Sequence, residues 1–339
     1  MEIMLPAGSV TGVGSLPFTD PRRALRFVAD HCPTLPFWPQ LPNRHPHEGV
    51  IAQGLGALAE LLEPAASPYC WRIRPSSVHR FASALEEEAA RLIPETAAGF
   101  FAFRSAFRGG EFPAAVAIKA QSEGPVTLAH CVLVEGQPLA RQVGWLDRFA
   151  SFLARQAAWQ IASLQQLGKP VLFVLDEPAI SLALAGASPE HTSAIVTAIN
   201  HVLNAVHEAG ALAGLHCCAP LPLPLVRSLN LDLVSFDAHL PIDDQGWLEV
   251  ASSIMARSGY LAFGLVPTNP ASGLEPSDLF AQWLRLAASA GDITEVASRT
   301  IVTATCGLAL TSPSHTTAVF NRCREAGERI KQLTHSTFL

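Results

Sequence analysis

Short apolar runs recur along the chain, and stretches with helical patterning separate most of them. Runs such as 171–175 (VLFVL) are wholly apolar rather than alternating. Strands of a parallel sheet read this way because helices cover both faces of the sheet. We interpret eight runs as strands, at 8–15, 35–39, 113–119, 171–175, 211–215, 233–236, 260–265 and 301–305.

The stretches between these runs carry helix signals. A helix is predicted to open near Asp20-Pro21, and others are predicted over 47–62, 142–167 and 189–209. Alternating strands and helices indicate βα units of an α/β protein, and eight such units predict a (β/α)8 TIM barrel. A barrel of this kind needs about 250 residues, so the 339 residues allow one domain, 1–339, with longer loops.

The segment 63–112 fits the alternation least well. It contains SPYCWRIRPSSV, a helix-like stretch at 82–93, the sequence FFAFRSAF, and Gly109-Gly110. We interpret it as an insertion between the second and third units. Two interpretations remain open: a hairpin or lid over the site, and an ordinary decorated loop.

Composition and charge narrow the range of partners. Hydrophobic residues make up 49% of the chain, charged residues 15%, and the formal net charge is −6. No block of Lys and Arg stands out, which argues against nucleic acid as a partner. We find no basic region before an apolar stretch at the N-terminus, and no apolar run of the roughly 18 residues that a membrane span requires. We therefore expect no membrane partner and a cytoplasmic location.

The cysteine count is odd, at seven. An odd count in a long chain without a visible signal peptide argues against a disulfide framework. Free cysteines pack well in protein cores. We assign this packing role to Cys32, Cys70, Cys131 and Cys323.

Polar residues gather directly after the predicted strands. The active site of a (β/α)8 enzyme lies at the carboxyl ends of its strands, so these positions are where chemistry is expected. The residues that follow five of the runs are Gly14-Ser15, Asp176-Glu177-Pro178, His216-Cys217-Cys218, Asp237-Ala238-His239 and Cys306-Gly307.

His216, Cys218 and Cys306 together indicate a metal site. Zinc prefers four ligands drawn from thiolate, imidazole and carboxylate, and catalytic sites keep one position for substrate. A His-x-Cys pair on extended backbone directs both side chains to the same side. Cys217 then points the other way and packs, or it exchanges roles with Cys218.

Six motifs in this order resemble the C-terminal catalytic barrel of cobalamin-independent methionine synthase. They are more similar still to the short, single-barrel core methionine synthases of the uroporphyrinogen decarboxylase and methionine synthase-like superfamily. The motifs are TGVGSLPFTD at 11–20, EGPVTLAH at 123–130, VLDEPA at 174–179, LHCC at 215–218, VSFDAH at 234–239 and TCGLAL at 305–310.

The resemblance implies a role for each matching position. The zinc ligands of the family fall on His216, Cys218 and Cys306, and its glutamate ligand falls on the shorter Asp237. Asp237 therefore either ligates zinc directly or orients His216. The residues that bind the amino-acid part of homocysteine fall on Val13, Gly14, Ser15, Asp176 and Gln53, the last where the family has an acid.

Three further positions depart from the family pattern. The proton-relay histidine falls on Val266, a substrate-binding glutamate falls on or near Leu182, and the tryptophan that stacks on folate falls near 130–131. The long enzymes also carry a second barrel, for which this sequence has no room. We therefore expect methylcobalamin or a methylated corrinoid protein, rather than folate, as the methyl donor.

Three hypotheses follow from these observations. The first is a zinc-dependent methyltransferase that makes methionine from homocysteine. The second is a corrinoid-linked methyltransferase of the uroporphyrinogen-decarboxylase-like group that acts on a different thiol. The third is a non-catalytic metal or corrinoid accessory protein, since fold does not imply function. The retained Gly14-Ser15 and Asp176 favour the first over the second, and the ligand set favours both over the third.

Overall fold

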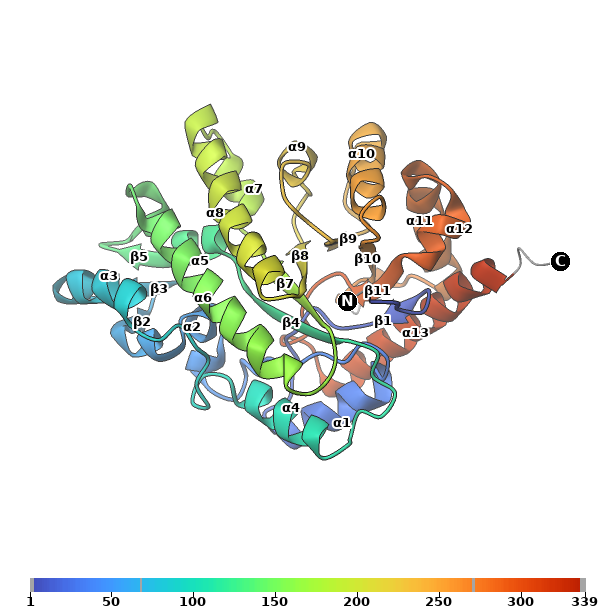
Figure 1. Ribbon diagram of the computed structural model, residues 1–339, viewed down its shortest axis with the longest axis horizontal. Helices are drawn as coiled ribbons and strands as arrows, with labels where there is room; N and C mark the ends of the chain where they lie inside the picture. The colour runs from blue at the N-terminus through green and yellow to red at the C-terminus, as the bar shows by residue number, and fades with distance from the viewer. Residues whose placement is uncertain (1–2, 68, 270–271, 336–339) are drawn as a thin grey trace.

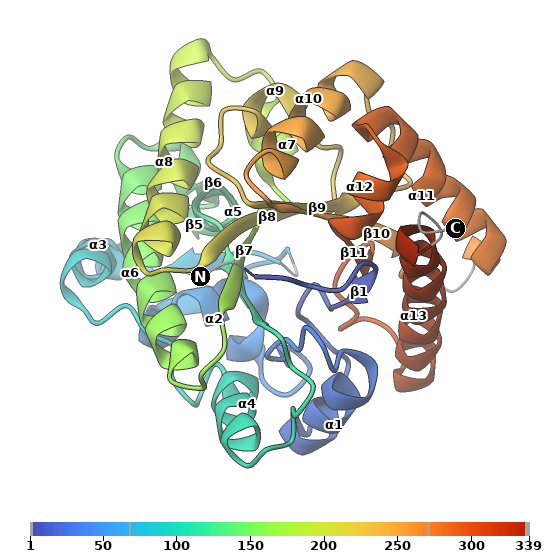
Figure 2. The same ribbon diagram turned by 45° about the vertical axis from the view of Figure 1, so that its right-hand side comes forward.

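A curled, parallel seven-stranded sheet forms the centre of the molecule in the computed structural model, which describes residues 3–67, 69–269 and 272–335. All neighbouring strands in this sheet are parallel. Figures 1 and 2 show helices surrounding it. Its order is β1 (Ser9–Val10), β11 (Thr300–Ala304), β10 (Tyr260–Val266), β9 (Leu233–Asp237), β8 (Leu212–Cys217), β7 (Val171–Asp176) and β4 (Ile118–Glu123).

The outer layer consists of helices that pack on the sheet and on one another. α6 lies against α8, α10 against α11, and α13 against β11. The longer helices are α1 (Pro21–His31), α3 (Val78–Glu87), α4 (Ala98–Arg108), α6 (Trp145–Gln165), α8 (Pro189–Glu208), α10 (Asp244–Met255), α11 (Pro276–Ala290) and α13 (Pro313–His335). The shorter ones are α2 (Val50–Gly54), α5 (Pro125–Cys131), α7 (Ile180–Leu184), α9 (Leu223–Val226) and α12 (Ile293–Ser298).

Most predicted boundaries lie within a few residues of those observed. α1 begins at Pro21, and the side chain of Asp20 accepts a hydrogen bond from the backbone N–H of Arg22, which caps the helix. Strands β7 to β11 overlap the five runs predicted for them, and all their residues are buried except Leu212 and Asp237, which are partly buried. The wholly apolar runs are therefore strands covered on both faces, as expected.

The third strand differs from its prediction. The run 113–119 predicted a strand that ends at Lys119, whereas β4 spans Ile118–Glu123. All six residues of β4 are buried, although Lys119, Gln121 and Glu123 are polar. The apolar pattern ended early because these alternate residues share one face of the strand, and that face lines a polar interior.

The second predicted strand, 35–39, is not a regular strand. Phe37 makes an isolated bridge to Lys119, and Gln40, directly after the segment, makes another to Ser15. The Lys119 amide donates to Pro36 O at 2.9 Å, and the Gln40 amide donates to Gly14 O at 3.0 Å. Pro36 and Pro39 have no N–H to donate, which prevents a continuous ladder here. The segment lies between the two edge strands of the sheet, β1 and β4.

The segment 63–112 contains the hairpin that was one of its two interpretations. Antiparallel β2 (Leu62–Pro64) and β3 (Trp71–Ile73) join β5 (Val132–Val134) and β6 (Gln137–Pro138) in a second, four-stranded sheet. The predicted helix 82–93 is α3, which begins and ends earlier. The rest of the segment is not all insertion, because α4 packs against α1 in the outer layer of helices.

The predicted helix 47–62 is interrupted. α2 ends at Gly54, and a 3-10 helix covers Gly56–Leu61. Gly56 has a φ of +56°, a left-handed conformation that breaks an α-helix and that glycine adopts without strain. None of the helices in the described part of the chain is long and apolar enough to span a bilayer.

Candidate metal centre

His216, Cys218 and Cys306 meet at the carboxyl edge of the sheet. His216 is the second-to-last residue of β8, Cys218 follows that strand, and Cys306 follows β11. One ligand atom from each side chain lies within 4.8 Å of the other two. The structure therefore brings together the three residues that the sequence predicted as metal ligands, from strands that are not neighbours in the sheet.

The imidazole of His216 presents one nitrogen to this group. Its Nδ1 lies 2.9 Å from Ser235 Oγ, in β9. Its Nε2 is buried and has no hydrogen-bond partner within the described residues. A buried ring nitrogen without a partner costs free energy, and a metal-bound histidine commonly uses its second nitrogen for a hydrogen bond like this one. The arrangement fits a metal ligand.

The thiols of Cys218 and Cys306 interact directly. The neighbouring Cys218 thiol and His216 imidazole lower the pKa of Cys306 to about 4, despite its burial. The neighbouring Cys306 raises the pKa of Cys218, and burial adds to this rise. A thiolate already stabilised next to a second thiol and an imidazole is a donor set suited to zinc.

Cys217 points away from the group. It is fully buried in the hydrophobic core, and its thiol donates to Ala219 O at 3.4 Å. Burial raises the pKa of this thiol to about 11. The alternation of side chains along β8 explains the difference, since His216 and Cys217 emerge on opposite faces.

Asp237 lies close to the three ligands without joining their group as defined above. Its Oδ1 accepts a hydrogen bond from the His239 backbone N–H at 2.9 Å. Burial raises the pKa of Asp237, and its charge interacts with Cys306 and His216. His239 is engaged elsewhere, with Nε2 2.7 Å from Leu265 O. Because Ser235 occupies Nδ1 of His216, Asp237 does not orient that ring through Nδ1, and its role as a zinc ligand stays a prediction.

Residues 13–15 lie beside Cys306. The Leu308 amide donates to Ser15 O at 2.9 Å, and a Cβ on Gly307 would lie 2.1 Å from Ser15 Oγ. Val13, Gly14, Ser15 and Cys306 line one small cavity. Gly14 has no room for a side chain either, since a Cβ there would lie 2.3 Å from Gln40 Oε1. Residues 13–15, which are predicted to bind the substrate carboxylate, therefore adjoin the group of His216, Cys218 and Cys306.

Asp176 ends β7 directly beside His216, its register partner in β8. It is 6% exposed, and its Oδ1 has no hydrogen-bond partner in the described part of the chain. Burial raises its pKa to about 6, although His216 and Lys119 act in the opposite direction. A carboxylate in this position has unused capacity to bind a cation.

Glu177, the next residue, serves a structural purpose. Its carboxylate accepts hydrogen bonds from the backbone N–H groups of Val126 and Thr127 and from the Thr127 hydroxyl. These donors belong to the first turn of α5, so Glu177 caps that helix from outside it. A Cβ on Gly124 would lie 2.1 Å from Glu177 Oε1, which explains the glycine. Burial raises the pKa of Glu177 to about 7.

Gln53 is buried, and both ends of its amide are bonded. Its Oε1 accepts from Gln40 Nε2 at 2.8 Å, and its Nε2 donates to Thr96 O at 2.9 Å. Gln40 itself follows the segment 35–39 and touches Gly14. Sequence reasoning missed Gln40, although its place after a predicted strand was a usable signal.

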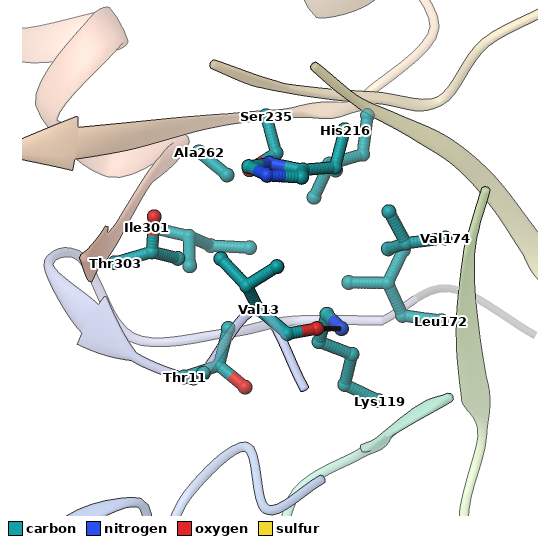
Figure 3. Close-up of a pocket in the computed structure, with 12 residues that line it drawn as sticks. Thr11, Val13, Lys119, Leu172, Val174, His216, Ser235, Ala262, Ile301 and Thr303 are labelled. Carbon is teal, nitrogen blue, oxygen red and sulfur yellow. Dashed lines mark hydrogen bonds between the residues drawn. The ribbon is translucent and has the colours of Figure 1, made fainter. Parts of the chain in front are cut away.

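Lys119 is a buried cation on β4. Its Nζ donates to Val13 O at 2.6 Å and to Gln121 Oε1 at 3.0 Å. Burial lowers its pKa to about 8. Figure 3 shows Lys119 and Val13 next to each other on one side of a small cavity. His216 and Ser235 lie on the other side. This lysine belongs to the same inner face of β4 as Glu123, a second residue that sequence reasoning missed as a site candidate.

The three departures from the family pattern lie in different surroundings. Val266 is buried at the end of β10, so no ionisable side chain occupies that position. Leu182 is 69% exposed on α7. His130 and Cys131 end α5, where His130 Nδ1 lies 3.2 Å from Val126 O.

Comparison with known proteins finds likeness in structure rather than in sequence. No protein-family model matches the chain, and no curated protein matches it. A solved B12-independent methionine synthase from Shewanella sp. W3-18-1, in complex with selenomethionine, has a TM-score of 0.50 at 14% identity. That match covers 65% of this chain and 64% of the other, less than two thirds of the other chain's length.

A solved methyltransferase from Methanosarcina mazei matches over nearly the whole length of both chains. Its TM-score is 0.51 at 14% identity, with 97% of this chain and 94% of the other covered. At this identity the likeness establishes the fold alone. The chain therefore shares an α/β, TIM-barrel-like fold with enzymes of methyl transfer.

Proposed function

We propose that the protein is a zinc-dependent methyltransferase that transfers a methyl group to a thiol, homocysteine, to form methionine. One observation carries the proposal: His216, Cys218 and Cys306 gather within 4.8 Å at the same edge as Asp176 and the turn 13–15. A metal group beside an anion-binding turn and a free carboxylate suits a thiol amino acid.

His216, Cys218 and Cys306 would hold the zinc, with Asp237 as a fourth ligand or as a charge nearby. When bound, zinc favours the thiolate form of a coordinated thiol near neutral pH. Ser235 holds the ring of His216 through Nδ1 and so keeps Nε2 directed at the metal. Gly14 lets the backbone approach the substrate carboxylate closely, and the Ser15 hydroxyl adds a donor.

The proposed methyl donor is methylcobalamin or a methylated corrinoid protein. Support comes from the position that carries the folate-stacking tryptophan in the family, which falls near His130 and Cys131 here. Neither side chain offers a comparable stacking surface. The partners proposed are thus a small thiol and a corrinoid, in the cytoplasm.

A second candidate is a methyltransferase of the uroporphyrinogen-decarboxylase-like group that acts on a different thiol. The near full-length likeness to the Methanosarcina mazei methyltransferase supports keeping it. For either candidate we propose that segment 35–40 serves as the second strand of an eight-stranded barrel. Its bridges to β4 and to Ser15 support this.

A methyl-transfer assay with zinc-loaded protein tests the proposal. Methylcobalamin and methyl-tetrahydrofolate are each offered with homocysteine or with an unrelated thiol such as 2-sulfanylethanesulfonate. We expect methionine from methylcobalamin and homocysteine only. Turnover with the folate donor at a comparable rate would contradict the donor assignment, and preference for the unrelated thiol would favour the second candidate.

A further inference from the structure

Glu123 is a buried acid at the inner edge of the site that no role described so far uses. Lys119, Gln121 and Glu123 alternate along β4 and therefore share its inner face. Lys119 reaches Val13 O from that face, which identifies it as the face turned to the site. Glu123 is 4% exposed, and its Oε2 has no hydrogen-bond partner within the described chain.

Glu123 lies directly opposite Asp176 in the pairing of β4 with β7. Asp176 in turn lies opposite His216 in β8. Each of the two acids has a buried oxygen without a partner among the described residues. Glu177 provides the contrast, because three donors from α5 satisfy its carboxylate. The two unsatisfied carboxylates therefore form a row that leads to the metal ligands.

Among the described residues, the cations nearby do not form ion pairs that would neutralise both Asp176 and Glu123. His216 and Lys119 both act on Asp176, and the Nζ of Lys119 is hydrogen-bonded to the neutral oxygens of Val13 and Gln121. A zinc ion held by two thiolates carries no net positive charge. Burial raises the pKa of Glu123, and the charge of Asp176 raises it further. Buried carboxylates in this state are stabilised by a cationic partner.

The family resemblance places a second substrate-binding acid at position 53, but this chain has Gln53 there. Gln53 is neutral, and Gln40 and Thr96 occupy its amide. The charge at the site thus comes from a different strand, β4, rather than from α2. Gly54 of α2 packs near Glu123, where a Cβ would lie 3.8 Å from Glu123 Cβ.

We propose that Glu123, together with Asp176, binds the ammonium group of the thiol substrate and so selects aminothiols. This rests on the proposed function, in which the substrate sulfur is held at the metal group. An ammonium group has three donors, enough for one oxygen from each acid and one further acceptor. Glu123 is then a specificity-determining residue that contacts substrate.

Binding affinities of matched thiols test the assignment. Calorimetry on zinc-loaded protein would compare homocysteine with the same thiol lacking the amine (desamino-homocysteine). We expect wild type to prefer homocysteine by about 10- to 100-fold, the range for a hydrogen bond to a charged group. Glu123→Gln should lose most of this preference and keep its affinity for desamino-homocysteine. Ser122→Ala, on the opposite face of β4, is the matched control and should change neither.

The variants also separate a substrate contact from a merely structural role. Glu123→Asp keeps the charge and should retain part of the preference, whereas a packing defect would affect Asp and Gln alike. Zinc content and circular dichroism establish that each variant is folded and loaded. An undiminished preference for homocysteine in Glu123→Gln would overturn the assignment, as would a wild type without any preference.

The experiments distinguish a failure of the proposed reaction from a failure of the assignment of Glu123. If the preference for the amine depends on Glu123 but no donor yields methionine, the assignment stands and the proposed reaction fails. If methionine forms and Glu123→Gln binds and discriminates like wild type, the reaction stands and the assignment fails.

Discussion

Ser235 Oγ lies 2.9 Å from Nδ1 of His216, and this contact leaves Nε2 of the same ring buried beside two thiols. The two residues are register partners in the β8–β9 pair, so the sheet itself sets their separation. Hydrogen bonds of this kind fix the orientation of a ligand ring and the nitrogen that it offers. Ser235, rather than Asp237, makes this contact with Nδ1.

Removal of this hydroxyl should weaken metal binding. We expect Ser235→Ala to lower zinc affinity by about 10- to 100-fold, because the ring of His216 loses the contact that orients it. Competition against a chelating indicator measures the change. Ser122→Ala removes a buried hydroxyl from another strand and should leave zinc affinity as it is. Equal affinities in Ser235→Ala and wild type would show that the ring needs no such support.

The three candidate ligands predict how single cysteine variants behave. Elemental analysis should find about one zinc per chain in wild type. Cys218→Ser and Cys306→Ser should each lose the metal, since a hydroxyl is a poor zinc ligand. Cys217→Ser should keep it, although a hydroxyl in the core should lower the Tm. Loss of zinc from Cys217→Ser with retention in Cys218→Ser would mean that the two cysteines exchange roles.

Variants of Asp237 show whether its charge or its hydrogen bond with the His239 backbone matters for zinc affinity. Asp237→Asn removes the negative charge near Cys306 and His216, and an amide oxygen still accepts from the His239 N–H. We expect Asp237→Asn to bind zinc more weakly than wild type, and Asp237→Glu to bind it better than Asp237→Asn. Zinc affinity and thiol methylation are measured in parallel. Full affinity and activity in Asp237→Asn would reduce Asp237 to a structural residue.

Lys119 should make stability depend on pH above neutrality. Its folded pKa of about 8 lies below its ordinary value of 10.5. Between these values the unfolded chain holds a proton that the folded chain lacks, so this residue makes stability rise with pH across that window. Below about pH 8 the buried charge costs the folded state the full penalty.

Lys119→Met removes that dependence. Relative to wild type, its unfolding free energy should be most favourable at pH 8 and below, and that advantage should shrink by on the order of 3 kcal/mol as pH approaches 10.5. Urea unfolding at a series of pH values gives the difference directly. A constant difference between the two proteins across pH 7 to about 10.5 would show that Lys119 keeps its ordinary pKa.

The order of strands and helices was open to prediction because it depends on local periodicity. Runs such as 171–175 are apolar on both faces, as expected for a strand that helices cover on both sides. His216 and Cys218 were identifiable for a similar reason, since both follow one strand at a spacing that puts them on one side. Cys306 became a candidate through the same rule applied to another strand.

Pairings across strands needed the tertiary structure. Glu123 pairs with Asp176, and Ser235 with His216, through the register of neighbouring strands, and no local pattern encodes register between strands. β4 was mispositioned because its inner face is polar, and segment 35–39 lost its ladder to two prolines. Sequence therefore determined which residues are candidate metal ligands. Only the pairing of strands in the tertiary structure decided which polar side chains lie beside them, because those contacts join residues far apart in the chain.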